Sequence, residues 1–546
     1  MTSRRRLPAT IAAGLAAGAV ALAGCTDGGG SASRTAANDG TDTPATSGLH
    51  VEPARFDTSA PAEPTTVLPD QDAARAALTT VRDLFETAPV VAVAAPSDAA
   101  AVKAAVDRGA PVLHPATDPA ELTAELQRLG TESVLLAEPG PPEATPTSTP
   151  SSAPTSTQSS GRTTAPSPTS SGALDHETLA AAVRAADAEV VTDPADLPAT
   201  TAAEPLGDVV VLTDGADWSS TAVASATAAG ARVLELPDGD PRTQPDVIAQ
   251  LAEHPPSHVL ALGDAFGDVE TVDTRVATAA TGVQLPGGGQ VVFPHRRVVA
   301  LYGHPGTSAL GVMGEQPLDE AVDRAHRTAA EYAELSDVPV VPAFEIITTV
   351  ASSEPGRDGD WSSESTVEEL RPWVDAARKA GMLVVLDLQP GTTDFLTQAK
   401  RYEELLVEPH VGLALDPEWR LQPGQRHMRQ IGSVSVEEVN SVITWLADLT
   451  GEHALPQKVL VLHQFRLSMI RDRELLDTSR DELAITIHAD GNGTPEQKFA
   501  TWDALRTGAP DNVHWAWKNF YDEDRPTFTP AQTMDVEPAP VFVSYQ

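Results

Sequence analysis

The C-terminal half of the chain alternates between short apolar runs and longer amphipathic stretches, and this alternation limits its fold more than any other feature. Eight runs read as strands: Val298–Tyr302, Val338–Phe344, Met382–Leu388, Val411–Leu415, Lys458–Leu462, Ala484–Ile487, Val513–Trp517 and Pro540–Ser544. Helical patterns lie between most of them: Leu318–Leu335, Thr366–Ala380, Thr393–Leu406, Val436–Thr450, Leu467–Leu476 and Glu496–Leu505. Eight strands over roughly 250 residues match the size of a (β/α)8 barrel, and only the seventh connection, 519–539, lacks a clear helix. We therefore expect residues 296–546 to form a TIM-type barrel. A doubly wound open sheet is the alternative, but no Gly-rich phosphate turn follows a strand.

The fourth of these strands carries the strongest chemical signal. It reads VGLALDPEWR from Val411 to Arg420. Because side chains alternate along a strand, Asp416 and Glu418 leave the same face, while the leucines face the other way. Pro417 has no N–H and ends regular pairing there. Two carboxylates are thus expected at the C-terminal mouth of the barrel, where barrel enzymes place their active sites.

Polar residues also end the other predicted strands, and the same rule collects them into one candidate pocket. Beside the proposed catalytic pair Glu418 and Asp416, the expected substrate-binding residues are Glu345, Asp387, Gln389, His304, His463, His488, Asp490, Trp517 and Lys518.

The Asp-x-Glu ending of the fourth strand resembles that of chitinase-like (family 18) glycoside hydrolases and the carboxylate pairs of family 25 lysozymes. The resemblance implies that Glu418 is the general acid, that Asp416 is its partner, and that the barrel acts on or binds cell-wall polysaccharide. Physically, neighbouring carboxylates do not both ionise cheaply, so one pKa rises and that group donates a proton near neutral pH. Trp517, Trp419 and Trp361 would stack on sugar faces. No metal or other cofactor is expected for this chemistry.

Two alternatives remain open. His463 and His488 end strands five and six, where amidohydrolase-type barrels place metal ligands, and His304 ends strand one. Imidazole and carboxylate ligands suit Zn²⁺, so a metal-dependent hydrolase is the first alternative. A catalytically inactive barrel that binds wall glycan is the second.

The N-terminal half contains a repeated βαβαβ pattern, the order typical of parallel sheets. We expect one α/β repeat at 72–140 and a second at 173–285, because matching strand runs follow helix-ending glycines at Gly109 and Gly230. Through Val211–Gly215 and Val259–Asp264, the repeats resemble the type 2 cell-wall-binding repeats of Gram-positive surface proteins. That resemblance implies a pair of Rossmann-like modules that hold the protein to wall polymers.

The remaining segments predict the location of the protein. Residues 1–25 read as a signal peptide with a basic start, an apolar run and Leu-Ala-Gly before Cys25. This ending resembles a lipoprotein lipobox and implies lipidation of Cys25, which would anchor the protein to the outer face of the cell membrane. Residues 26–71 read as a flexible tether and 141–172 as a Pro/Ser/Thr-rich linker. A net charge of −40 argues against nucleic acid as a partner.

Overall fold

The structure, a computed structural model, describes residues 53–69, 71–136 and 174–546. Cys25, the tether up to residue 52 and the Pro/Ser/Thr-rich linker lie outside the described residues. Pro53–Gln546 belong to one compact unit. Among the described helices, none combines the length and the apolar character that crossing a bilayer requires.

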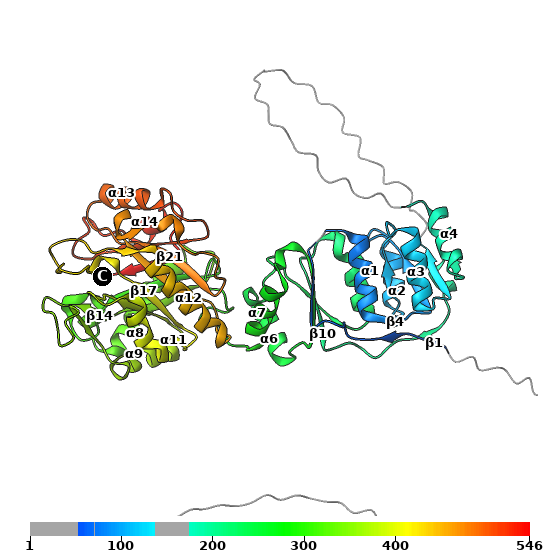
Figure 1. Cartoon of the computed structure of the whole chain (residues 1–546), viewed down its shortest axis with the longest axis horizontal. Helices are drawn as coiled ribbons and strands as arrows, with labels where there is room; N and C mark the ends of the chain where they lie inside the picture. Colours follow the sequence, from blue (N-terminus) through cyan, green and yellow to red (C-terminus); the bar gives the residue numbers. More distant parts are fainter. Residues whose placement is uncertain (1–52, 70, 137–173) are drawn as a thin grey trace, which may run out of the picture. The chain divides into compact units, whose positions relative to one another are not determined.

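Eight parallel strands close into a barrel in the C-terminal region, which confirms the predicted barrel architecture (Figure 1). They are β13 (Arg297–Gly303), β14 (Val340–Ala351), β16 (Leu383–Leu388), β17 (Val411–Leu415), β19 (Lys458–Gln464), β21 (Leu483–Ala489), β22 (His514–Asn519) and β23 (Phe542–Tyr545). Strand β13 pairs in parallel with both β14 and β23, so the ring has no free edge. The open-sheet alternative is therefore wrong. Outside the ring, β15 (Ser362–Glu364) adds an antiparallel pairing to the end of β14.

Side-chain alternation divides the barrel into an inner and an outer core. The inner core holds mainly small and β-branched strand residues, among them Val298, Ala300, Ala343, Val385, Ala414, Val461 and Ala516. The alternate positions, such as Leu413 and Leu415, pack outward against the helices. Gly412 points inward where β17 approaches β19, and a Cβ there would overlap the Val459 backbone. The predicted orientation of the fourth strand is confirmed.

Helices cover the outside of the strands, as Figure 1 shows for α8, α9, α11 and α12. Their bounds are α8 (Leu318–Ala333), α9 (Val367–Lys379), α10 (Phe395–Ala399), α11 (Glu403–Leu406), α12 (Val436–Glu452), α13 (Pro495–Arg506) and α14 (Pro530–Met534). A capping box explains where α9 begins: the Thr366 hydroxyl accepts from the Glu369 N–H, and the Glu369 carboxylate accepts from the Thr366 N–H.

One predicted barrel helix is wrong. The stretch Leu467–Leu476 forms two 3₁₀ turns around β20 (Ile470–Arg471), which pairs with β18 (Val434–Ser435). The side chain of Arg473 is buried there and donates to Gln464 and to the Leu505 carbonyl. A strand pairing and an inward-facing guanidinium thus override the helical spacing of the leucines.

The N-terminal region contains two four-stranded parallel sheets. The first has the order β6-β5-β7-β8 and the second β11-β10-β12-β3. The strands of the first sheet are β5 (Val90–Val93), β6 (Val112–Leu113), β7 (Ser133–Leu136) and β8 (Glu189–Val191). Those of the second are β3 (Thr65–Leu68), β10 (Val209–Thr213), β11 (Arg232–Glu235) and β12 (His258–Leu262). The helices of this region are α1 (Ala73–Leu84), α2 (Ala99–Val106), α3 (Pro119–Leu129), α4 (His176–Ala185), α5 (Ser220–Ala228), α6 (Pro245–Glu253) and α7 (Val269–Ala280).

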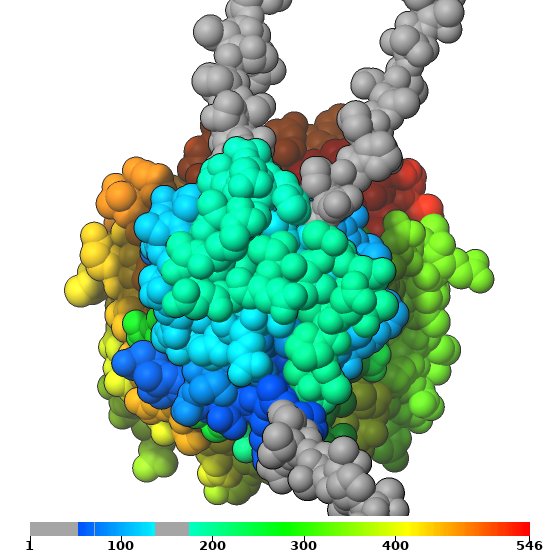
Figure 2. Space-filling model, turned by 90° about the vertical axis from the view of Figure 1, so that its right-hand side faces the viewer, coloured from blue at the N-terminus to red at the C-terminus, as the bar shows by residue number. Residues whose placement is uncertain are grey.

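Two predicted boundaries in this region need correction. The expected tether extends to residue 71, yet residues 54–68 contribute strands, including β1 (Ala54–Arg55), β2 (Asp57–Thr58) and β3. Strand β3 pairs with β12 and so completes the second sheet. Helix α4 and strand β8 follow the linker in the sequence but belong with the first sheet. Strand β8 pairs with β7, and α4 packs on α3, where Thr123 donates to the Ala182 carbonyl. In Figure 2 the segment that directly follows the linker, coloured teal, lies over the blue and cyan residues of the first sheet.

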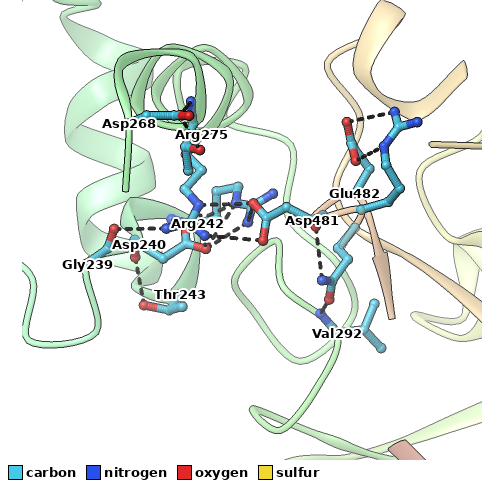
Figure 3. Close-up of polar contacts among 12 residues, drawn as sticks. Gly239, Asp240, Arg242, Thr243, Asp268, Arg275, Val292, Asp481 and Glu482 are labelled. Atoms are coloured by element: carbon cyan, nitrogen blue, oxygen red, sulfur yellow. Dashed lines mark hydrogen bonds and ion pairs between the residues drawn. The ribbon is translucent and has the colours of Figure 1, made fainter. Parts of the chain in front are cut away.

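The segment between α7 and β13 closes the N-terminal end of the barrel. Leu285, Val292 and Phe293 join the inner core, and the Gln457 side chain accepts from the Val292 N–H. Nearby, Arg242 and Arg275 both bind the carboxylate of Asp481, which lies just before β21, and Asp240 binds Arg242 from the other side (Figure 3). Two guanidinium groups facing two carboxylates make this cluster electrically balanced.

Candidate active site at the carboxyl ends of the barrel strands

A cavity of about 540 Å³ opens at the carboxyl ends of the barrel strands. This is the end at which barrel enzymes carry their active sites. Its polar and charged lining includes Tyr302, Gln389, Asp416, Glu418, Arg466, Asp490, Asn492, Lys518 and Glu523. Its aromatic lining is Trp419, Phe465 and Phe520. The cavity therefore combines carboxylates with flat apolar surfaces.

Asp416 and Glu418 both line the cavity, as their spacing predicts. After β17 ends at Leu415, the chain turns through a 3₁₀ segment, Pro417–Trp419. The Asp416 carboxylate caps this turn by accepting from the Glu418 N–H at 3.2 Å. This hydrogen bond fixes the direction of the turn and leaves Glu418 half-buried beside the cavity.

The surroundings of Glu418 favour its protonated form. Burial, followed by the negative charge of Asp490, raises the pKa of Glu418 to about 7. Burial and the neighbouring Asp387 also raise the pKa of Asp416 well above its usual range. Two of the carboxyl groups beside the cavity are thus disposed to carry protons near neutral pH.

Asp490 is in a different environment from Glu418. Its carboxylate forms an ion pair with Lys518 Nζ at 3.3 Å, and the ammonium also lies 3.5 Å from the centre of the Tyr302 ring. Burial opposes ionisation, but the charge of Lys518, together with the hydrogen bond and charge of His463, outweighs it and holds the pKa of Asp490 below its usual range. The cavity therefore offers one carboxyl that is readily protonated and one carboxylate that is held as an anion.

Four further predicted site residues lie one layer deeper in the barrel. Glu345, Asp387, His463 and His488 are fully buried and are absent from the cavity lining. Asp387 and His488 each stand two positions before a lining residue, Gln389 or Asp490, that directly follows the end of their strand, which puts them on the same inner face but further from the mouth. Strand β14 continues to Ala351, seven residues beyond its predicted end, so Glu345 lies within the strand.

Strong electrostatic coupling links these deeper groups. His463 Nε2 lies 2.9 Å from Glu345 Oε1, and His463 Nδ1 lies 3.1 Å from Asp490 Oδ2. Burial opposes the charge on His463, but Glu345, Asp490 and Asp387 together outweigh it and raise the pKa of His463 well above its usual range. Burial, followed by the charge of His463, lowers the pKa of His488 to about 3. Burial raises the pKa of Asp387 to about 6.

The other predicted site residues lie in three different places. Gln389 and Lys518 line the cavity, as expected. His304 lines a separate cavity of about 630 Å³, where its Nε2 contacts the Ser365 hydroxyl at 3.3 Å. The placement of Trp517 is a correction: it faces outward from β22 and packs with Trp502 and Phe528. Lys518, one position later, takes the inward direction, so strand alternation excludes Trp517 from the cavity.

Several residues that line the cavity were not predicted from the ends of the strands. Phe465 and Arg466 follow β19, and Phe520 follows β22, each beyond the last residue of its strand. Tyr302 lies inside β13 and donates its hydroxyl hydrogen to Asp387 at 2.9 Å. Tyr302 alternates with Ala300 and Val298, which face the inside of the barrel, and this alternation is the one feature of the sequence that places Tyr302 on the inner face. Trp419 lines the cavity, whereas Trp361 is not part of the lining and lies under the guanidinium of Arg426.

No known protein-family model matches the chain, and a search of curated proteins finds none that is detectably similar in sequence.

Proposed function

We propose that the barrel is a glycoside-hydrolase-like domain that acts on cell-wall polysaccharide, with Glu418 as the general acid. The observation that supports this most is the position of Glu418: it lines an open cavity at the carboxyl ends of the strands, and its pKa is raised to about 7. A carboxyl group with such a pKa donates a proton efficiently near neutral pH.

The second carboxylate for this chemistry is Asp490. Glycosidases use a proton-donating carboxyl and an anionic carboxylate on either side of the scissile bond. Asp490 lines the same cavity and is ion-paired with Lys518. In the proposed reaction, Glu418 protonates the departing glycosidic oxygen. Asp490 either takes a proton from a water that attacks the anomeric carbon, or attacks that carbon itself to form a glycosyl-enzyme that water then hydrolyses. Asp416, which caps the turn beneath Glu418, holds the acid in place.

The rest of the lining fits a sugar ligand. Trp419, Phe465 and Phe520 offer the aromatic surfaces on which sugar rings pack, and Gln389, Asn492 and Lys518 offer hydrogen-bonding groups for hydroxyls. A binding role without turnover would use the same surfaces.

The proposal is tested with Glu418→Gln, which retains the shape of the side chain and removes its acidic proton. Wild type and variant are incubated with purified cell-wall glycans, and released reducing ends and bound glycan are measured. We expect the variant to bind glycan but to lose turnover by about 10²–10⁴-fold. Glu334→Gln, the same substitution at the exposed end of α8, is the matched control and should leave turnover unchanged. Equal rates in wild type and Glu418→Gln would refute the role of Glu418.

We further propose that the chain is a surface lipoprotein anchored through Cys25 and that its two α/β sheets are Rossmann-like repeats serving as wall-binding modules. The lipobox-like Leu-Ala-Gly-Cys sequence supports the anchor. The corresponding strand orders of the two sheets support the repeat interpretation: in each sheet the first strand of the βαβαβ unit lies between the second and the third.

A further inference from the structure

Beneath the proposed active site, four buried side chains converge from adjacent barrel strands. Glu345 comes from β14, Asp387 from β16, His463 from β19 and His488 from β21. Both carboxylate oxygens of Glu345, Oδ1 of Asp387 and Nε2 of His463 have no hydrogen-bond partner among the described residues. A buried polar atom left without a partner costs about 1–3 kcal/mol, and more when it is charged. His463 Nε2 and Glu345 Oε1 form an ion pair with each other, but Glu345 Oε2 and Asp387 Oδ1 are left without a partner and require an explanation.

A proton on His463 does not satisfy this group. Nε2 carries a single hydrogen, so it serves one oxygen at most. It forms an ion pair with Glu345 Oε1 at 2.9 Å, whereas Asp387 Oδ1, at 3.8 Å, is too far away for a hydrogen bond. A cation would satisfy these oxygens, because it accepts lone pairs from several ligand atoms at once.

The far sides of the same residues are hydrogen-bonded. His463 Nδ1 lies 3.1 Å from Asp490 Oδ2, and His488 Nε2 lies 3.2 Å from the Ser544 hydroxyl. Asp387 Oδ2 accepts from the Tyr302 hydroxyl at 2.9 Å. Such outer contacts typically orient metal-ligating histidines and carboxylates and leave the inner lone pairs free.

We propose that Glu345, His463 and His488 bind a divalent cation, for which Zn²⁺ is the best fit, with Asp387 Oδ1 as the fourth ligand. Candidate ligand atoms of the first three residues all lie within 4.8 Å of one another. Ligands at about 2.1 Å from a tetrahedral Zn²⁺ are about 3.4 Å apart, so the ligand atoms would move closer together on binding. His488 ligates through Nδ1, and the Nδ1–H of His463, now 3.0 Å from that atom, turns to Asp490 alone.

This ion is distinct from the chemistry assigned to Glu418. Its ligands are fully buried, whereas Glu418 lies at the cavity, and no step of the proposed glycoside cleavage passes through it. Two imidazoles and two carboxylates form a donor set that suits Zn²⁺. The ion would neutralise the carboxylates and fix the floor of the pocket. This inference departs from the sequence-based expectation that no metal is required.

The test is the metal content of the full chain, purified without metal-affinity resin, dialysed against Zn²⁺ and then against metal-free buffer. Elemental analysis should give one zinc per chain, and the stripped protein should show a Tm that rises when Zn²⁺ is added, because ligand binding stabilises the folded state. Co²⁺ in place of Zn²⁺ should give the visible absorption of a four-coordinate site.

Glu345→Gln and His488→Gln should each lose the zinc and the Zn²⁺-dependent rise in Tm. The matched control is His410→Gln, since the His410 ring is also buried but its Nε2 contacts the Val374 carbonyl, away from the proposed ligands. It should retain both the zinc and the rise in Tm. If the variants do not fold, the wild-type zinc content and Co²⁺ spectrum decide. Wild-type protein without stoichiometric zinc, and with an unchanged Tm in Zn²⁺, would overturn the proposal and leave the role of Glu418 untouched.

Discussion

The environment of Glu418 sets the pH range in which the proposed acid is protonated. Burial and the charge of Asp490 raise its pKa from 4.5 to about 7, so the carboxyl keeps its proton up to neutral pH. We expect kcat/KM on glycan to fall as pH rises through about 7, approaching tenfold per pH unit. A pH–rate profile checks this. A fall that begins near pH 5 would mean that Glu418 has an ordinary pKa or is not the acid.

Lys458, at the opposite end of the barrel, gives a prediction for stability. Its buried ammonium donates to the Glu408 and Val411 carbonyls, and burial lowers its pKa from 10.5 to about 7. Between those values the unfolded chain binds a proton that the folded chain does not, so raising the pH stabilises the fold. This extra stability of the folded state is fully present above the pKa of Lys458 in the unfolded chain and is lost as the pH falls through about 7.

The variant Lys458→Met removes this linkage. From pH 7 to pH 10, wild type should gain unfolding free energy relative to the variant, on the order of a few kcal/mol. Urea denaturation of both proteins at several pH values measures the difference. Parallel pH dependences would show that Lys458 is not neutral in the folded protein.

At the scale of elements, strand β3 gives a sharp prediction because it completes the second sheet from a distant part of the chain. It pairs with β12, and the Thr65 hydroxyl donates to Asp273 on α7. A chain that starts at residue 72 would leave β12 as an unpaired edge. We expect this truncation to lower Tm and to accelerate amide exchange in β12, while a chain that starts at residue 53 retains wild-type behaviour. Unchanged exchange in β12 would show that β3 contributes little.

The elements that the sequence predicts well are those with a local signal. Each barrel strand is an apolar run of several residues, so all eight were predictable from their own sequence. Strand β8 has three residues and β3 has four, and both depend on partners far along the chain, so no local pattern marks them. In the site, spacing placed Asp416 and Glu418 correctly. Spacing did not predict how deep in the barrel a side chain lies. That depends on where the strand ends, which decides whether a residue such as Glu345 lies at the mouth or in the core.

At the scale of the whole molecule, the proposed anchor determines where the protein is found. Cys25 follows Leu-Ala-Gly, the sequence that supports lipidation. Cys25→Ser should release the protein from the membrane fraction into the medium, since the acyl chains that hold it would be absent. Fractionation followed by immunoblotting of wild type and variant measures this. A variant that remains in the membrane fraction with unchanged mobility would contradict the anchor.

Because β3 pairs with β12, it cannot join its sheet until the later strand has been synthesised. Thr65 is paired with Val259 of β12, and its hydroxyl donates to Asp273 of α7, which lies 208 positions further along the chain. At a synthesis rate of about 5–20 residues per second, roughly 10–40 s pass between their appearances. The strands β5 to β8 are complete before then, so the first sheet is able to form while β3 still lacks its neighbour. The earliest strand of the second sheet is thus the last to be used.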